Sequence, residues 1–378
     1  MPTPPLSDEE LLRSLEVRNR HRTLDDAARE LGITRSTLQN RLLRAAERGL
    51  DGSTPVKIPL NQKVKGISTL TDVAGNVILQ WTKTTTDEKA AAVESAIRDA
   101  FERYRSPAIL PAPTGYTDES LLVVYPVVDL HLGLFSWAKE TGEDYDLKIA
   151  ADLLRSSVSN LVGRAAPART ALILDMGDYF HTDNSKNQTA RSGNPLDVDT
   201  RYGKVAQVGV ELAVEVIELA LQKHERVEYR KLPGNHDDET SLMLAIALAA
   251  WFRDNPRVSI STDPSRFFMK QFGLCMVAAT HGDMLKMGDM AGYMAAKWPR
   301  EWGETEHRYG YTGHVHHDRV KAGNGVRLES FNTLAAKDAW HAGEGYMSPR
   351  SMVSITLHRD YGEVDRLTAC LPMLKRAA

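Results

Sequence analysis

Residues 227–237, VEYRKLPGNHD, lead from a predicted strand through a glycine to Asn, His and Asp. This order is typical of a buried strand that ends in a loop, where glycine lets the backbone turn sharply and approach a ligand closely. Four other stretches likewise join a predicted strand to Asp or His, and in the last three a glycine adjoins that residue: LLVVYPVVDLH (121–131), ALILDMGD (171–178), MVAATHGD (276–283) and RYGYTGHVH (308–316). In each stretch, Asp, Asn or His stands where a strand is expected to end.

Helical patterns over 151–162, 205–222 and 242–252 separate several of these strands. Strands that alternate with helices indicate an α/β fold, whose ligands lie at the carboxyl ends of the strands. Residues two apart lie on one face of a strand, so the members of D-x-H and of H-x-H are each expected to point the same way. One site is therefore predicted from Asp129, His131, Asp178, Asn235, His236, His281, His314 and His316. Its mixture of N and O ligands suits Mn, Fe or Zn better than Ca or Mg.

In their order along the chain, the motifs D-x-H, G-D, G-N-H-D, H-G and G-H-x-H resemble those of the calcineurin-like metallophosphoesterase superfamily, over about 121–372. The resemblance implies a four-layer αββα sandwich and a phosphoester hydrolase with two divalent metal ions, Mn before Fe or Zn. It implies further that these ions share a hydroxide for in-line attack.

The same resemblance assigns a role to each motif residue. Asp178 would bridge the two metal ions, and His236 would stabilise the transition state or protonate the leaving oxygen, with Asp237 orienting it. The first metal would be bound by Asp129, His131 and His316, and the second by Asn235, His281 and His314.

Several stretches bear on the substrate. DLHLG (129–133) and GDYFH (177–181) resemble the corresponding stretches of Mre11/SbcD-type DNA nucleases. His181 would contact substrate or, equally, support a metal ligand, and Lys186 and Arg191 in the long polar loop 182–204 are predicted to bind substrate. Segment 293–311 interleaves aromatic and basic residues, which suits single-stranded nucleic acid, unless its tryptophans pack into the core.

The first 50 residues predict three helices. Ser7 begins a capping box, Thr23 caps a second helix, and Gly32 suits the turn before a third helix from Arg35. The stretch AARELGITRSTLQNRL (27–42) resembles the helix-turn-helix domains of bacterial and phage regulators. The third helix would present to DNA Arg35, Ser36, Gln39, Asn40, Arg41 and Arg44. The alternative is a packing module that forms a homodimer.

Three further regions complete the expected organisation. Residues 51–105 predict a wing-like β-hairpin, with its turn at 74–76, followed by an amphipathic helix over 87–104. Residues 106–117 form a proline-rich linker, and the catalytic domain spans 118–378.

Bulk properties exclude several classes of protein. The 378 residues carry a formal net charge of −3, so the molecule as a whole is no basic nucleic-acid clamp. Two cysteines and the absence of a signal-peptide pattern in MPTPPLSDEE predict a cytoplasmic protein. The longest apolar run, 242–252, is far shorter than the roughly 20 residues that cross a bilayer, so no membrane association is expected.

These observations favour a Mn-dependent DNA nuclease recruited to DNA by its N-terminal helices. One alternative is a phosphatase or phosphodiesterase for small nucleotides, with the N-terminal region serving targeting or dimerisation. Another is a DNA-binding regulator with a degenerate phosphoesterase fold, which the complete ligand set disfavours.

Overall fold

The computed structural model describes residues 6–50, 62–71, 77–86, 111–189, 192–338, 342–343, 345 and 349–377. The chain divides into two compact units, Met1–Ala92 and Val93–Ala378. The hairpin turn predicted at 74–76, the helix predicted over 87–104 and the first half of the predicted linker lie outside the described residues.

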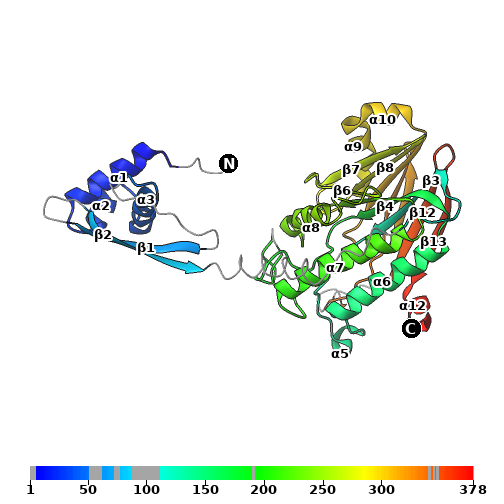
Figure 1. Ribbon diagram of the computed structural model, residues 1–378, viewed down its shortest axis with the longest axis horizontal. Coiled ribbons are helices and arrows are strands. Elements are labelled where there is room, and N and C mark those ends of the chain that lie inside the picture. The colour runs from blue at the N-terminus through cyan, green and yellow to red at the C-terminus, as the bar shows by residue number, and fades with distance from the viewer. Residues whose placement is uncertain are drawn as a thin grey trace. The chain divides into compact units, whose positions relative to one another are not determined.

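Three helices build the first unit (Figure 1): α1 (Asp8–Arg20), α2 (Leu24–Glu30) and α3 (Arg35–Glu47). The predicted caps are confirmed, because Ser7 and Glu10 form a reciprocal capping box and the Thr23 side chain accepts from the N–H of Asp26. Gly32 has a φ of +66°, the left-handed conformation that ends α2. Thr34 then caps α3, with its hydroxyl oxygen accepting from the N–H of Thr37.

A small apolar core joins these helices to one another, with its centre at Val17, Ala27, Ala28 and Leu38. The predicted hairpin is present as β1 (Gln62–Thr71) and β2 (Val77–Thr86), which pair antiparallel. The N-terminal unit is therefore three helices with a two-stranded sheet.

Six strands form the first sheet of the second unit, in the order β13-β12-β3-β4-β5-β6. Neighbours from β3 to β6 run parallel, whereas β12 runs antiparallel to both β3 and β13. The bounds are β3 (Asp118–Val127), β4 (Ala168–Asp175), β5 (Arg226–Lys231), β6 (Val258–Ser261), β12 (Ser351–His358) and β13 (Gly362–Cys370).

A second sheet has five strands in the order β10-β11-β9-β8-β7. The central strands β8, β9 and β11 are parallel, and β7 and β10 are antiparallel at the edges. The bounds are β7 (Phe267–Phe272), β8 (Cys275–Thr280), β9 (His307–Thr312), β10 (Arg319–Gly323) and β11 (Val326–Ser330).

Alternating residues of β4 show how the layers pack. Leu172 and Leu174 belong to an apolar core that contains residues of both sheets, including Val277 of β8. Ala171 and Ile173 point to the other face, into a core shared with the helices. The period of two along the strand therefore supplies one face to each neighbouring layer.

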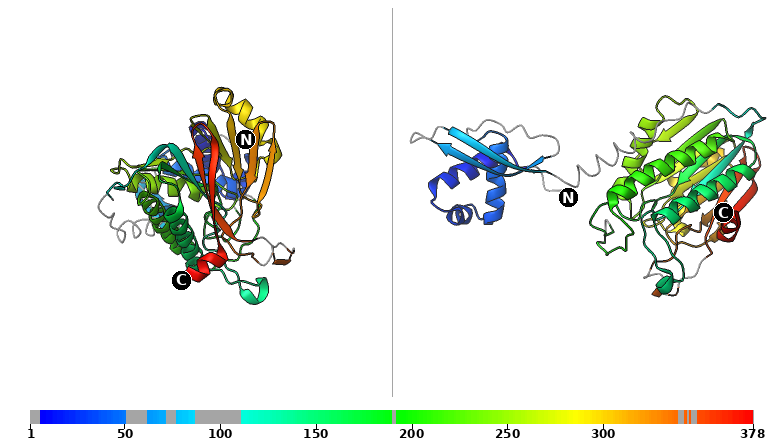
Figure 2. Two further views of the ribbon diagram at one scale, coloured as in Figure 1. Left: turned by 90° about the vertical axis from the view of Figure 1, so that its right-hand side faces the viewer. Right: turned by 60° about the horizontal axis from the view of Figure 1, so that its bottom comes forward.

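Helices cover the outer faces of the two sheets. The six-stranded sheet is covered by α6 (Leu147–Arg164), α7 (Tyr202–Leu221) and α8 (Asp238–Trp251), of which α6 and α7 lie side by side in Figures 1 and 2. The outer face of the five-stranded sheet packs against η1 (Met287–Asp289), α9 (Met290–Lys297) and α10 (Pro299–Glu304). Among the described residues, two further short helices are α5 (Ala138–Thr141) and α12 (Leu371–Ala377). Among the described helices, none has both the length and the apolarity to cross a membrane.

Candidate metal centre

The predicted site residues stand on five loops, each after a strand. The loops follow β3, β4 and β5, which are parallel neighbours in one sheet, and β8 and β9, which are parallel neighbours in the other. Parallel neighbours end at the same edge, so the loops of each sheet meet there. The eight residues of the predicted site are brought together as expected.

Five of the predicted metal ligands have left-handed backbone, which non-glycine residues rarely adopt. Their φ angles are 47° for Asp129, 47° for His131, 52° for Asp178, 69° for His314 and 55° for His316. The expectation that each paired motif lies on a regular strand is therefore wrong, because β3 and β9 end before their motifs begin. Such strain persists where the surroundings enforce it, and it is concentrated at functional sites.

Glycines let these loops approach each other. A Cβ on Gly177, whose φ is +101°, would lie 2.7 Å from Nδ1 of His281. A Cβ on Gly234 would collide with the carboxylate of Asp178. The glycines predicted to allow close approach are therefore required by side chains of the site itself.

The first candidate ligand group contains Asp129, His131 and His316, whose ligand atoms lie within 4.8 Å of one another. Nε2 of His131 is 3.1 Å from Nε2 of His316, and this second nitrogen is 4.0 Å from Oδ1 of Asp129. Asp129 and His131 are buried, whereas the His316 side chain is 21% exposed. The group is thus open to solvent on the His316 side.

The second candidate group contains Asp178, His281 and His314, again within 4.8 Å. Nε2 of His281 lies 3.2 Å from Oδ2 of Asp178 and 3.0 Å from Oδ1 of Asn235. The amide oxygen of Asn235 therefore adjoins this group, as the sequence predicts for a fourth ligand.

Asp178 lies between the two groups through one oxygen. Its Oδ2 is 4.0 Å from Nε2 of His131 in the first group and 3.2 Å from Nε2 of His281 in the second. The other oxygen, Oδ1, accepts the backbone N–H of His236 at 2.8 Å, which fixes the carboxylate. This is the placement that a bridging carboxylate requires.

Backbone carbonyls determine which imidazole nitrogens face the site. Nδ1 of His281 donates to the carbonyl oxygen of Met176 (3.0 Å), so Nε2 is the atom available for a metal. Nδ1 of His236 likewise donates to the carbonyl oxygen of His181 (2.9 Å), which leaves its Nε2 toward the site.

Burial and neighbouring charges give the two carboxylates different protonation behaviour. Burial raises the pKa of Asp129 to about 7, although His281 opposes the shift. Burial also raises the pKa of Asp178, but His281 outweighs it and holds that pKa well below its usual range. His281 therefore offsets the charge of Asp129 only in part.

The histidines differ in the same way. Burial holds the pKa of His131 well below its usual range, which keeps a lone pair available for a metal. Burial opposes the charge of His281, but Asp178 and Asp129 raise its pKa to about 10. A proton on Nε2 of His281 and a metal ion would thus compete for the same position beside Oδ2 of Asp178.

One buried oxygen of the site has no hydrogen-bond partner among the described residues. This is Oδ1 of Asp129, which lies 3.7 Å from Nδ1 of His281 and 4.0 Å from Nε2 of His316. A buried carboxylate oxygen without a partner is costly, and buried charges are normally paired or coordinate metals. The position therefore fits a cation.

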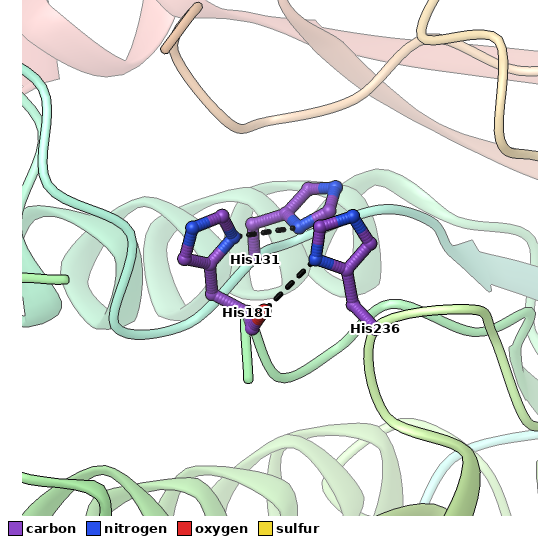
Figure 3. Close-up of side chains that lie close together, drawn as sticks. All are labelled: His131, His181 and His236. Atoms are coloured by element: carbon purple, nitrogen blue, oxygen red, sulfur yellow. Dashed lines mark hydrogen bonds between the residues drawn. The ribbon is translucent and has the colours of Figure 1, made fainter. Parts of the chain in front are cut away.

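His181 does not lie where a substrate-binding residue is needed. Its side chain is 2% exposed, and its Nδ1 lies 3.2 Å from Nδ1 of His131. Figure 3 shows the rings of His131, His181 and His236 converging, with His181 stacked on His236 at a centroid distance of 5.3 Å. Of the two predicted roles of His181, its burial against His131 and His236 favours support of these neighbours over contact with substrate.

Asp237 also differs from expectation, because its carboxylate does not orient His236. Its two oxygens accept the backbone N–H groups of Asp178, Tyr179, Phe180 and Gly234, and the ammonium of Lys231. The carbonyl of His181 holds His236 instead. Asp237 therefore fixes loops, and it is a positioning residue.

Two residues that support this site were missed by sequence reasoning. Lys231 is buried between Asp175 and Asp237. Asp183 accepts the N–H groups of Glu239 and Thr240, and so caps α8 from a distant loop. The available sequence signal for Lys231 was a lysine at the end of a predicted strand, just before Gly234-Asn235-His236.

The structure describes some of the other residues that are predicted to contact substrate. Lys186 is exposed, and Arg191 lies outside the described residues. Trp298 and Trp302 pack against the core beneath α9, and Arg308 lies over the Trp302 ring at 4.5 Å. Core packing therefore accounts for both tryptophans.

On α3, five of the six predicted DNA contacts are exposed, while Arg41 is partly buried. Arg35 pairs with Asp25 at 3.2 Å, with both side chains 58% exposed. Such an exposed pair is weak, so it leaves Arg35 available to another anion.

No family model matches the sequence, and no curated protein matches it either. Three solved structures are similar over 66% of this chain and at least 96% of their own. They are a conserved uncharacterized protein of Streptococcus pneumoniae described as a predicted phosphoesterase (9% identity, TM-score 0.29), Vps29 of Chaetomium thermophilum (10%, 0.30) and vacuolar protein sorting 29 of Cryptosporidium parvum (15%, 0.31). Likeness at these TM-scores carries no argument about function, which rests on the side chains described above.

Proposed function

We propose that the chain is a two-metal phosphoesterase of the calcineurin-like type, and that its substrate is the phosphodiester of DNA. The observation that carries the metal-dependent part is the unpartnered buried oxygen of Asp129 among the imidazoles. A purely structural histidine cluster would not retain, at its centre, a buried carboxylate oxygen without a hydrogen bond.

The ligand sets follow from the two groups. Asp129, His131 and His316 would hold one divalent ion, and Asn235, His281 and His314 the other, with Oδ2 of Asp178 between them. Bound divalent ions lower the pKa of water and offset the charge of the phosphoryl oxygens during in-line displacement. The mixed N and O donors suit Mn before Ca or Mg.

His236 is the residue for proton transfer to the leaving group. Its Nδ1 proton is committed to the carbonyl of His181, so any proton that it gives to a leaving oxygen comes from Nε2. The ring is stacked on His181 and meets His131 edge to face, which restricts its rotation. The chain thus fixes one donor atom toward the substrate.

DNA is the substrate that accounts for features of both units. The exposed side of α3 carries amide, hydroxyl and guanidinium groups, the types that contact phosphates and base edges. We propose that α3 recruits DNA to the metal centre. The resemblance of DLHLG and GDYFH to Mre11/SbcD-type nucleases supports the same substrate class.

The test compares labelled single-stranded DNA, double-stranded DNA, small nucleotides and bis(p-nitrophenyl) phosphate, each with Mn²⁺ and with EDTA. We expect Mn²⁺-dependent cleavage of DNA and of the chromogenic diester. Hydrolysis of small nucleotides alone would replace DNA by that substrate class. Absence of Mn²⁺ binding and of all hydrolysis would refute the metal-centre proposal.

The role of His236 has a separate test. His236→Ala should lower kcat by about 10²–10⁴-fold while Mn²⁺ binding is unchanged, because this ring is assigned no metal. Unchanged kcat would remove His236 from proton transfer without affecting the metal assignment.

A further inference from the structure

Lys231 is a buried cation directly behind the metal centre. It is the last residue of β5, and its side chain is 0% exposed. Its ammonium lies 2.8 Å from Oδ2 of Asp237, 3.1 Å from Oδ1 of Asp175 and 3.0 Å from the carbonyl oxygen of Leu232. Three acceptors thus match the three N–H groups of the ammonium.

The carboxylate beside Lys231 holds two loops of the centre. Oδ1 of Asp237 accepts the N–H groups of Asp178 and Gly234, each at 3.0 Å. Oδ2 accepts those of Tyr179 and Phe180, at 2.9 and 3.2 Å. One loop carries the bridging carboxylate, and the other carries Asn235 and His236.

The loop at Asp178 needs such support, because this residue has a φ of 52°. A left-handed non-glycine residue is strained and persists only where its surroundings over-determine it. Three consecutive N–H groups bound to one buried carboxylate are a constraint of that kind. The constraint requires the carboxylate to stay in place, and Lys231 is the cation paired with it.

We propose that Lys231 is a positioning residue for metal binding: its ammonium holds Asp237 against the backbone of 178–180 and 234, and this fixes Asp178 and Asn235 in ligand geometry. The inference rests on the proposed metal centre. Removing one partner of a buried ion pair leaves an uncompensated charge, so the carboxylate is expected to shift and both loops with it.

Arg230 supplies a matched control. It is adjacent in β5, and its side chain is 2% exposed, so it is buried as Lys231 is. Its guanidinium contacts Ser261 and the backbone carbonyls of Asp263 and Ser265, away from the ligand loops. Arg230→Met and Lys231→Met therefore both remove a buried cation, but only the second removes the partner of Asp237.

The test is calorimetric titration of Mn²⁺ into the full-length metal-free chain, at a temperature where urea unfolding shows each variant to be folded. Lys231→Met should bind Mn²⁺ about 10–100-fold more weakly, as expected when the support of a metal ligand is lost. Arg230→Met should lose stability and keep the wild-type affinity. Equal affinities for wild type and Lys231→Met, with normal binding by wild type, would overturn the inference alone.

A second variant keeps the test decisive if Lys231→Met does not fold. Asp237→Asn retains the size of the side chain but weakens its pairing with the ammonium, and it should also weaken Mn²⁺ binding. Lys231→Met/Asp237→Asn removes both members of the Lys231–Asp237 pair, and Asp175 loses its ammonium partner in this variant as it does in Lys231→Met. The cost at Asp175 is therefore common to both, and stability should be higher than additivity predicts. Wild-type affinity in Asp237→Asn would contradict the proposed role. A wild-type chain that binds no Mn²⁺ would instead refute the metal centre itself.

Discussion

The backbone N–H of His314 donates a hydrogen bond of 2.7 Å to Oδ2 of Asp129, although the residues are 185 positions apart. Both have left-handed backbone. The bond occupies one oxygen of the carboxylate and leaves Oδ1 among imidazole nitrogens. The first and last motifs therefore share one carboxylate, and its remaining oxygen is directed at the metal position.

Asp129→Asn should separate stability from metal binding. In EDTA at pH 8, the variant should be more stable than wild type by about 1–3 kcal/mol, since it removes a buried charged oxygen without a partner. Burial raises the pKa of Asp129 to about 7, so its ionised form is disfavoured in the folded metal-free chain. The contribution of the Asp129 carboxyl to the stability of the metal-free wild type is present below its unfolded pKa and is lost as the pH rises through about 7.

Urea unfolding in EDTA measures this difference, and calorimetry with Mn²⁺ measures the loss of binding in the same variant. At pH 4 the gain in stability should shrink, because the wild-type carboxyl is then protonated in the folded state. A variant that is less stable than wild type at pH 8 would contradict the cation position assigned to Oδ1.

Backbone strain at His316 gives a second prediction. A protein with glycine inside a helix or strand is normally less stable than the same protein with alanine there, by about 0.5–1 kcal/mol. With a φ of 55°, the order should reverse, and His316→Gly should be more stable than His316→Ala by about 1 kcal/mol. Urea unfolding in EDTA compares the two variants, both of which lack the imidazole.

Position 317 is the control for this comparison. His317 follows His316 directly and does not have a positive φ. Its ring binds the carbonyl oxygen of Val315. His317→Gly should therefore be less stable than His317→Ala. If the alanine variant is the more stable at both positions, the left-handed backbone of His316 stores no strain.

The sequence predicts which residues meet at the metal centre, because it predicts where the strands end. An apolar run followed by Gly and Asp, Asn or His marks the end of a buried strand, and parallel strands end at the same edge. The pattern therefore predicts which residues meet, as at Asp178 and His281. The pattern does not reveal backbone conformation, so it predicts a shared strand face for Asp129 and His131, which are left-handed in the structure.

Support from distant residues is harder to predict. Asp237 adjoins His236 in sequence, yet its carboxylate binds backbone N–H groups that lie 57 to 59 positions away. His181 has the sequence context of a substrate residue, but the packing of two other histidines around it is a tertiary property. Whether a polar side chain contacts substrate or supports a neighbouring side chain depends on the residues that the fold places around it.

The DNA-binding proposal predicts a change in salt dependence. Arg44→Ala on the exposed face of α3 should reduce the slope of log K against log salt by about 1, if this guanidinium binds one phosphate. Arg29→Ala on α2 is the control, because Arg29 is also exposed but lies outside α3, the helix to which the DNA contacts are assigned. Fluorescence titration of a labelled duplex from 50 to 200 mM salt measures both. An unchanged slope in Arg44→Ala would exclude that contact.

His224 predicts how the second unit responds to acid. Its Nδ1 donates to the carbonyl oxygen of Ala168 (2.7 Å), so its Nε2 accepts from the hydroxyl of Tyr125 (2.9 Å). Burial lowers the pKa of His224 to about 4. Because this folded value lies below the unfolded one, its contribution to stability is present above pH 6.5 and is lost as the pH falls toward 4.

A shift of this size corresponds to about 3 kcal/mol. His224→Gln lacks the titrating group, so the stability advantage of wild type over this variant should fall by about that amount between pH 7 and pH 4. Urea unfolding in EDTA at both pH values measures it, and taking the difference cancels the other buried histidines, which titrate in both proteins. An advantage that stays constant with pH would show that His224 is not held neutral by the fold.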